Sequence, residues 1–207
     1  MIAEAIRRSP LADYAGRFSA LFDASKGEIS IRELPFLTQI NLRTDPQDEA
    51  TMQRLGSLLG FALPLSPNTV ASARDRRALW LGPDEWLVVG DPDQGKTIEQ
   101  SVRDVLAGAA ASIADISAGR TAVLIRGDQA QGLLARGIAI DLYPRVFVPG
   151  RCAQTLLARA QVLIERSDDD AFHLYLRSSY ASYCADWLLD AAADSNLSMA
   201  LIAGPPP

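Results

Sequence analysis

The stretch RALWLGPDEWLVVG, residues 77–90, constrains the fold of this chain more than any other segment. Residues 82–85, Gly-Pro-Asp-Glu, suit a type I turn, so the two flanking runs are expected to form a β-hairpin. Regular pairing around that turn predicts two opposed pairs, Leu81 with Trp86 and Trp80 with Leu87. Side chains alternate between the faces of a strand, and here both faces are apolar, so both must be covered. One covering layer is expected to be the chain's own helices. The second is either more of the same chain or a partner protein.

Composition excludes several classes of protein. Of the 207 residues, 48% are hydrophobic and 22% are charged, which is typical of a globular chain that can bury a substantial core. The net charge of −5 argues against nucleic acid or an anionic membrane surface as partner. There is no run of 18 apolar residues and no signal-peptide pattern at the start. The two cysteines, Cys152 and Cys184, do not make a disulfide framework, so we expect a cytoplasmic protein.

Hydrophobic periodicity predicts strands and helices along most of the chain. Strands are expected at 28–34, 36–43, 112–117, 121–126, 152–166 and 172–177, and helices at 94–106, 128–137 and 180–192. The segment 55–63 fits either a helix or a strand, and 64–77 has the composition of a loop. A hairpin followed by a helix recurs at 77–107, loosely at 112–137, and at 152–192. Repeated ββα units predict an α+β fold, an antiparallel sheet with helices packed on one face.

The same signals suggest how the chain is divided. Residues 1–76 are expected to form an N-terminal arm and lead-in strands packed on the rest. Residues 77–195 are expected to form the α+β domain, and residues 196–207, which end in Gly-Pro-Pro-Pro, a flexible tail.

A phosphate-loop pattern, G-x-x-x-x-G-K-[ST], occurs in GDPDQGKT at residues 90–97, after a predicted strand and before a predicted helix. Its fixed positions are Gly90, Gly95, Lys96 and Thr97. A nucleotide-binding protein is therefore one hypothesis. Against it, Asp91 and Asp93 would place negative charge beside the phosphates, and Pro92 lacks the N–H group that such a loop uses. The other interpretation is a turn into a helix with a solvated Lys96.

Other residues with reactive side chains lack partners in the sequence. His173, the single histidine, shares a strand face with Tyr175 and Arg177 and is expected at the surface. The two cysteines fit core positions. Asp115 and Asp141 stand at the edges of apolar segments, where an aspartate often caps a turn. We therefore expect no catalytic residue and no metal site, and a chain that does not catalyse a reaction alone.

Four segments together resemble the gamma subunit of heterotetrameric sarcosine oxidase. They are LGPDEWLVV, DISAGRTAVLIRGDQAQGLLARG, IDLYPRVFVPGRCAQTLLARAQVLIER and FHLYLRSSYASYCADWLLDAA, within residues 77–192. The succession of the segments is more specific than any one of them. The resemblance implies the folate-binding, aminomethyltransferase-like fold, which agrees with the ββα interpretation.

The resemblance also implies a function. This family belongs to an assembly of alpha, beta, gamma and delta subunits that oxidatively demethylates sarcosine to glycine, with hydrogen peroxide and methylene-tetrahydrofolate as further products. It implies FAD, FMN, NAD and tetrahydrofolate in the larger partner subunits and zinc in the small delta subunit. It implies no catalytic residue in gamma itself. A close relative acting on another N-methyl amino acid, such as N-methylglutamate, would have a similar sequence.

Three hypotheses follow. The first is an accessory subunit of an amine-oxidising complex, with Trp80, Trp86 and Asp84 as candidate subunit-interface residues, because aromatic anchors concentrate binding energy. The alternative for both tryptophans is a place in the core. The second hypothesis is the phosphate-loop protein, and the third is a free-standing folate-binding protein of one-carbon metabolism.

Overall fold

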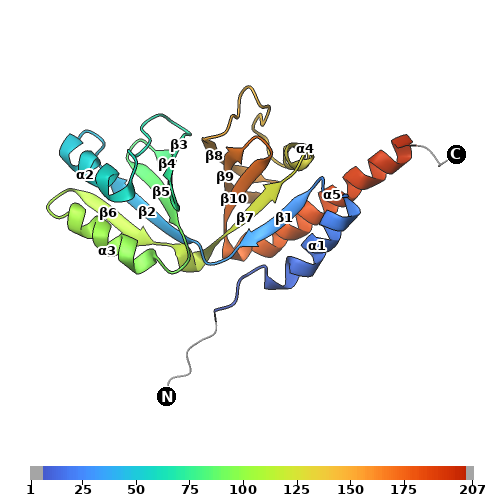
Figure 1. Ribbon diagram of the computed structural model, residues 1–207, viewed down its shortest axis with the longest axis horizontal. Coiled ribbons are helices and arrows are strands. Elements are labelled where there is room, and N and C mark those ends of the chain that lie inside the picture. The colour runs from blue at the N-terminus through green and yellow to red at the C-terminus, as the bar shows by residue number, and fades with distance from the viewer. Residues whose placement is uncertain (1–6, 204–207) are drawn as a thin grey trace, which may run out of the picture.

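Two five-stranded antiparallel sheets form the framework of the computed structural model, which describes residues 7–203, with side chains described to residue 194 (Figure 1). The first, here called the β2 sheet, has the order β3 (Val70–Ala73), β4 (Arg76–Gly82), β5 (Glu85–Gly90), β2 (Thr38–Thr44), β6 (Ala111–Asp115). The second, the β7 sheet, has the order β1 (Ser30–Leu34), β7 (Arg120–Arg126), β10 (Ala171–Arg177), β9 (Ala160–Asp168), β8 (Arg151–Leu157). The fold is α+β, as predicted, but with two sheets where the sequence suggested one.

Helices cover the outer face of each sheet (Figure 1). The β2 sheet carries α2 (Glu49–Leu59) and α3 (Gly95–Val105), and the β7 sheet carries α1 (Ala15–Ala24), α4 (Ala130–Ala135) and α5 (Ala181–Ala203). Short 3₁₀ turns occur at Ala12–Tyr14, Ser117–Gly119 and Ser178–Tyr180. Within the described residues no helix is both long and apolar enough to cross a membrane.

The two halves repeat one topology. In each, a strand and a helix are followed by three strands and a second helix: β2-α2-β3-β4-β5-α3 and β7-α4-β8-β9-β10-α5. The remaining strands are exchanged, because β1 precedes β2 but pairs with β7, and β6 precedes β7 but pairs with β2. The predicted ββα units at 77–107 and 152–192 are therefore confirmed. The looser unit at 112–137 is wrong, since β6 and β7 belong to different sheets.

The second layer over the predicted hairpin is the other sheet of the same chain. Three buried clusters fill the molecule, one under the helices of each sheet and one between the sheets. The cluster between the sheets consists of Leu79, Leu87, Val89, Ala122, Cys152, Leu163 and Tyr175. At one edge the sheets also meet through backbone bonds, from Val70 N to Gly150 O (2.9 Å) and from Cys152 N to Asn68 O (3.0 Å).

Residues before position 77 are integral to both sheets. β2 lies between β5 and β6, and β1 forms one edge of the β7 sheet, so the predicted lead-in strands are integral parts of the framework. The ambiguous segment 55–63 lies largely in α2, which is capped by Asp48 through its side chain and the Thr51 N–H (3.0 Å). The predicted loop at 64–77 contains β3. Helix α5 continues to Ala203, past the predicted end at 192 and into the predicted tail, of which residues 204–207 lie outside the described residues.

Candidate functional site

The tryptophan hairpin differs from the predicted register by one residue. Trp80 lies opposite Trp86 and Leu79 opposite Leu87, while Gly82 pairs with Glu85 across the turn. Leu81 is thus an extra residue in β4, a bulge that shifts all pairs beyond it. The predicted pairs, Leu81 with Trp86 and Trp80 with Leu87, are therefore wrong. They assumed a regular ladder next to the turn.

The three candidate interface residues have different environments. Trp86 is 0% exposed, packs under α2 and α3, and donates its indole N–H to Pro64 O at 2.7 Å, so it is part of the core of this chain. Trp80 is only partly buried. Asp84 is partly exposed and accepts a bond from Arg43 Nη2 at 2.9 Å, which raises the pKa of that guanidinium. Only Trp80 and Asp84 therefore offer surface to a partner.

The phosphate-loop pattern lies between β5 and α3. Lys96 and Thr97 are exposed, and Asp93 pairs with Arg7 at 2.5 Å. The first residue of α3, Gly95, packs against the carboxylate of Asp115 so closely that a Cβ atom there would overlap it. A carboxylate thus occupies the position beside the helix start where a phosphate would need to lie, and it would repel one.

A buried polar cluster, not predicted from the sequence, connects the two sheets. Glu165 of β9 lies with both carboxylate oxygens 3.2 Å from Arg77 Nη1 of β4, and the hydroxyl of Tyr175 donates to Oε2 at 2.7 Å. His173 of β10 lies with Nδ1 3.8 Å from the same oxygen. We call Arg77, Glu165, His173 and Tyr175 the Glu165 cluster. Its carboxylate is satisfied internally by groups from both sheets.

His173 is buried, contrary to the predicted surface position. Only 8% of the residue is exposed, and burial lowers its pKa to about 4, while Glu165 acts in the opposite direction. Burial also raises the pKa of Tyr175. Residues 173 and 175 alternate with apolar neighbours, but that polar face points to the other sheet and not to water.

Both cysteines lie in the core, as predicted. Cys152 and Cys184 are free thiols, 0% and 1% exposed, and burial raises their pKa values to about 12 and about 11. Such thiols are poor nucleophiles near neutral pH. The two turn-capping aspartates are also confirmed, because Asp115 accepts from Ser117 N at 2.9 Å and Asp141 from Tyr143 N at 2.8 Å.

A polar cleft of about 550 Å³ opens between the sheets. The β2 sheet contributes Asn41, Leu81, Glu85 and Leu87, and the β7 sheet contributes Arg120, Gln154, Thr155, Leu156, Gln161, Val162, Leu163 and Arg177, with Ile116 from the connection between β6 and β7. The amide of Gln154 donates to Leu81 O at 2.8 Å and joins the two walls. Neither arginine of the cleft, Arg120 or Arg177, was a predicted site residue, because the two lie 57 positions apart in the chain.

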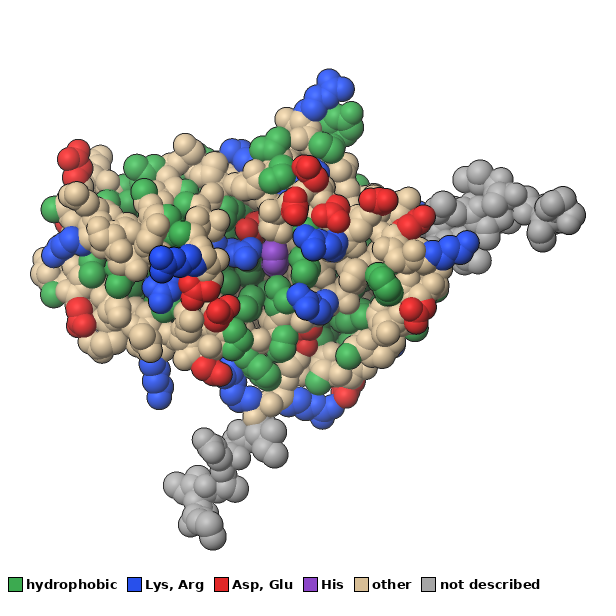
Figure 2. All heavy atoms as spheres, in the orientation of Figure 1, with side chains coloured by type: hydrophobic (Ala, Val, Ile, Leu, Met, Phe, Trp, Pro, Cys, Tyr) green, Lys and Arg blue, Asp and Glu red, His purple; other side chains and the backbone are tan. Residues whose placement is uncertain are grey.

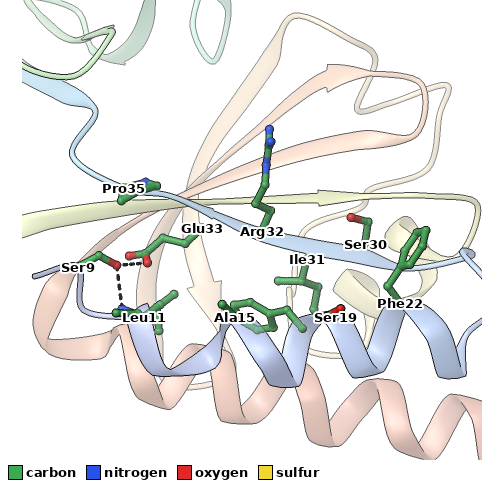
Figure 3. Close-up of a pocket in the computed structure, with 12 residues that line it drawn as sticks. Ser9, Leu11, Ala15, Ser19, Phe22, Ser30, Ile31, Arg32, Glu33 and Pro35 are labelled. Atoms are coloured by element: carbon green, nitrogen blue, oxygen red, sulfur yellow. Dashed lines mark hydrogen bonds between the residues drawn. The ribbon is translucent and has the colours of Figure 1, made fainter.

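A second, apolar groove of about 590 Å³ lies between α1 and the edge strand β1 (Figure 3). Ile31 points from β1 toward α1, and Phe22 stands at the far end. At the opposite end Ser9 accepts a hydrogen bond from Leu11 N at 3.3 Å and donates one to Glu33.

Figure 2 shows acidic and basic side chains interspersed over one face of the molecule. In the described part of the chain no three His, Cys, Asp or Glu residues are grouped as a metal site would require.

Comparisons with known proteins agree on one family. Residues 43–194 match the model described as "Sarcosine oxidase, gamma subunit family". The gamma subunits of sarcosine oxidase from Corynebacterium sp. (strain U-96) and from Arthrobacter sp. are each 30% identical over 190 residues, which is 91% of both chains in each comparison.

Two solved structures extend this result. A chain of heterotetrameric sarcosine oxidase from Corynebacterium sp. U-96 superposes with a TM-score of 0.81 and 28% identity, covering 91% of this chain and 95% of that one. The glycine cleavage system aminomethyltransferase T from Bartonella henselae superposes with a TM-score of 0.63 and 15% identity, covering 85% of this chain and 49% of that one. The second match shows a shared fold alone, and it agrees with the predicted aminomethyltransferase-like fold.

Proposed function

Because the chain belongs to the sarcosine oxidase gamma subunit family, we propose that it is the gamma subunit of a cytoplasmic, heterotetrameric sarcosine oxidase. One observation carries the proposal: the similarity to a chain of such an enzyme extends over 91% of this chain and 95% of that one. The similarity therefore extends over both sheets and their helices and is not limited to one shared motif. The partners are the alpha, beta and delta subunits. The complex oxidatively demethylates sarcosine to glycine, or a related N-methyl amino acid such as N-methylglutamate to the corresponding demethylated amino acid. The other products are hydrogen peroxide and methylene-tetrahydrofolate.

Within that complex we assign this chain an accessory, non-catalytic role. Its buried titratable groups support the assignment: Glu165 is held by Arg77 and Tyr175, and burial raises the pKa values of both thiols. We place FAD, FMN, NAD and tetrahydrofolate in the larger subunits and zinc in the delta subunit.

The exposed end of the tryptophan hairpin is the proposed contact with a neighbouring subunit. Asp84 lies in the turn and pairs with Arg43, and Trp80 lies in β4 two residues before Gly82; all three retain exposed surface in the isolated chain. An aromatic ring and an ion pair on the same hairpin provide an apolar anchor and polar groups that fix orientation.

Co-expression with the three partner chains tests the assignment. We expect a tag on this chain to recover a yellow complex with all four subunits in equal amounts. Omission of this chain should abolish recovery of the intact complex or reduce its stability. Assembly of a fully active, equally stable oxidase from the other three chains would contradict the proposal.

Ligand binding by the chain alone tests the alternatives. Binding of ATP or GTP that Lys96→Ala abolishes would support a phosphate-loop protein, although the Asp115 carboxylate beside Gly95 disfavours it. Binding of tetrahydrofolate by the chain alone would support a free-standing folate-binding protein. Neither ligand is expected to bind.

A further inference from the structure

The cleft between the sheets contains an unusual pair of basic residues. Arg120 is the first residue of β7 and Arg177 the last of β10, and the two are directly opposed in the antiparallel ladder. Directly opposed residues share one face of a sheet and have Cβ atoms roughly 5 Å apart. Both side chains line the cleft. The fold thus brings two guanidinium groups together at one end of the cavity.

These two guanidinium groups are not neutralised by the residues that the structure describes. Neither Arg120 nor Arg177 forms an ion pair there, whereas Arg43, Arg77 and Arg126 each do. Arg120 donates its Nε–H to Gln39 Oε1 at 3.1 Å, a bond that fixes the plane of the guanidinium and leaves its two terminal nitrogens available. The other end of that buried amide, Gln39 Nε2, has no hydrogen-bond partner among the described residues.

Such an arrangement is unfavourable without a ligand. Like charges directly opposed across a ladder destabilise a sheet. Burial, followed by the charge of Arg177, lowers the pKa of Arg120, which shows that its surroundings disfavour the charged form. Among the residues that line the cleft, Glu85 carries the one carboxylate. It lies on the wall formed by the β2 sheet and accepts a bond from Asn41 Nδ2 of the same sheet at 2.7 Å. The cleft therefore has an excess of positive charge.

The remaining walls favour an organic ligand. Leu81 and Leu87 on one side and Leu163 on the other provide apolar surface, and Gln161 adds a polar group. A volume of about 550 Å³ is within the range of small-molecule sites. Guanidinium forks match the planar geometry of a carboxylate.

We propose that the cleft between the two sheets binds a small organic carboxylate, with Arg120 and Arg177 as the groups that hold its charged end and the leucine side chains as the wall for its carbon skeleton. This inference does not depend on the assembly proposed above, because it concerns a cavity within one chain.

Titration of the full-length chain with succinate at constant ionic strength tests the site. Ligand-observed NMR and the shift in melting temperature are the measurements. We expect saturable binding to the wild-type chain, and binding weaker by about tenfold or more in both Arg120→Gln and Arg177→Gln. The control is Arg159→Gln, which removes the same charge from an exposed position in the turn between β8 and β9, outside the residues that line the cleft, and should leave binding unchanged.

Three results would overturn the proposal. The first is the absence of saturable succinate binding to the folded wild-type chain. The second is equal weakening in the control variant, which would show a general effect of net charge. The third is equally tight binding of inorganic phosphate or of the uncharged succinamide, which would show that the site does not select a carboxylate. Because Arg177 is exposed and its variant should fold normally, loss of binding in Arg177→Gln with an unchanged melting temperature would support the proposal even if Arg120→Gln is unstable.

Discussion

Gly127 connects β7 to α4 in a backbone conformation that only glycine adopts without strain. Its φ is +121°, and a Cβ atom there would overlap the carbonyl oxygen of Glu28. The same oxygen accepts a bond from Gln129 N at 3.2 Å, so the backbone cannot move away without breaking that contact. We expect Gly127→Ala to lower the free energy of unfolding by about 2 kcal/mol or more, measured by urea denaturation.

Substitutions at two other glycines distinguish the effect of backbone strain from the effect of the clash with Glu28. Gly108 has a φ of +84° but no described atom within 4 Å of a Cβ position, so Gly108→Ala should cost about 1 kcal/mol from backbone strain alone. Gly119 has neither constraint, so Gly119→Ala should be within about 0.5 kcal/mol of the wild type. Similar losses in all three variants would contradict the proposed clash with Glu28.

His173 should make stability depend on pH. Its pKa in the folded chain is lowered to about 4 by burial, whereas in the unfolded chain it is close to 6.5. Between these values the unfolded state binds a proton that the folded state does not, so the stabilising contribution is complete above pH 6.5 and is lost as the pH falls toward 4. The loss is of the order of 1.4 kcal/mol per pH unit within that window at most.

His173→Gln should remove that part of the pH dependence. Urea denaturation at several pH values from 7 to 4.5 measures the slope of the unfolding free energy, and the variant should show a shallower slope than the wild type. A loss of unfolding free energy that is the same at every pH does not change the slope, so the comparison of slopes reports the titration of the imidazole. Parallel slopes would mean that His173 titrates equally in both states.

At the scale of elements, the observed register of the tryptophan hairpin assigns the two rings to different tasks. Trp86 is fully buried under α2 and α3 with its N–H satisfied, so Trp86→Ala should destabilise the isolated chain by about 3–5 kcal/mol. Trp80→Ala should cost markedly less, because the ring is only partly buried. Thermal and urea denaturation of the chain alone measure both. Equal losses would contradict this division.

Local patterns predicted most elements, but they did not predict which sheet an element joins. The hairpins and helices at 77–107 and 152–192 follow from turn residues between apolar runs and from helical periodicity in the chain itself. The exchange of β1 and β6 between the sheets has no local signal, because β6 pairs with residues 67–75 positions away and β1 with residues 88–96 positions away. The bulge at Leu81 likewise depends on packing beyond the turn.

The polar groups between the sheets illustrate the same limit in the site. His173 and Tyr175 fit a solvent-exposed strand face when their own strand is considered alone. Only the β2 sheet, which carries Arg77 opposite Glu165, makes that face internal. Arg120 and Arg177 also become neighbours through the pairing of β7 with β10, which no spacing along the sequence indicates.

At the scale of the whole molecule, the sheets and helices of this chain do not cover Trp80 and Asp84 completely, so their exposed surface is available to a partner. The hairpin end lies away from the Glu165 cluster, and its ion pair between Asp84 and Arg43 is about half exposed, so it contributes little to stability by itself. If this end contacts a partner subunit, Asp84→Ala and Trp80→Ala should both weaken assembly with the oxidase partners, and Trp80→Ala should do so by about tenfold or more. Asp84→Ala should leave the melting temperature of the chain unchanged.

Asp13 offers a matched control, since it is another exposed aspartate paired with an arginine, Arg8, at 2.6 Å, but it lies beside α1. Retention of the partners on the tagged chain, compared across Asp84→Ala, Trp80→Ala and Asp13→Ala, measures the effect. Weakening by Asp13→Ala alone would move the proposed contact from the hairpin to the region of α1.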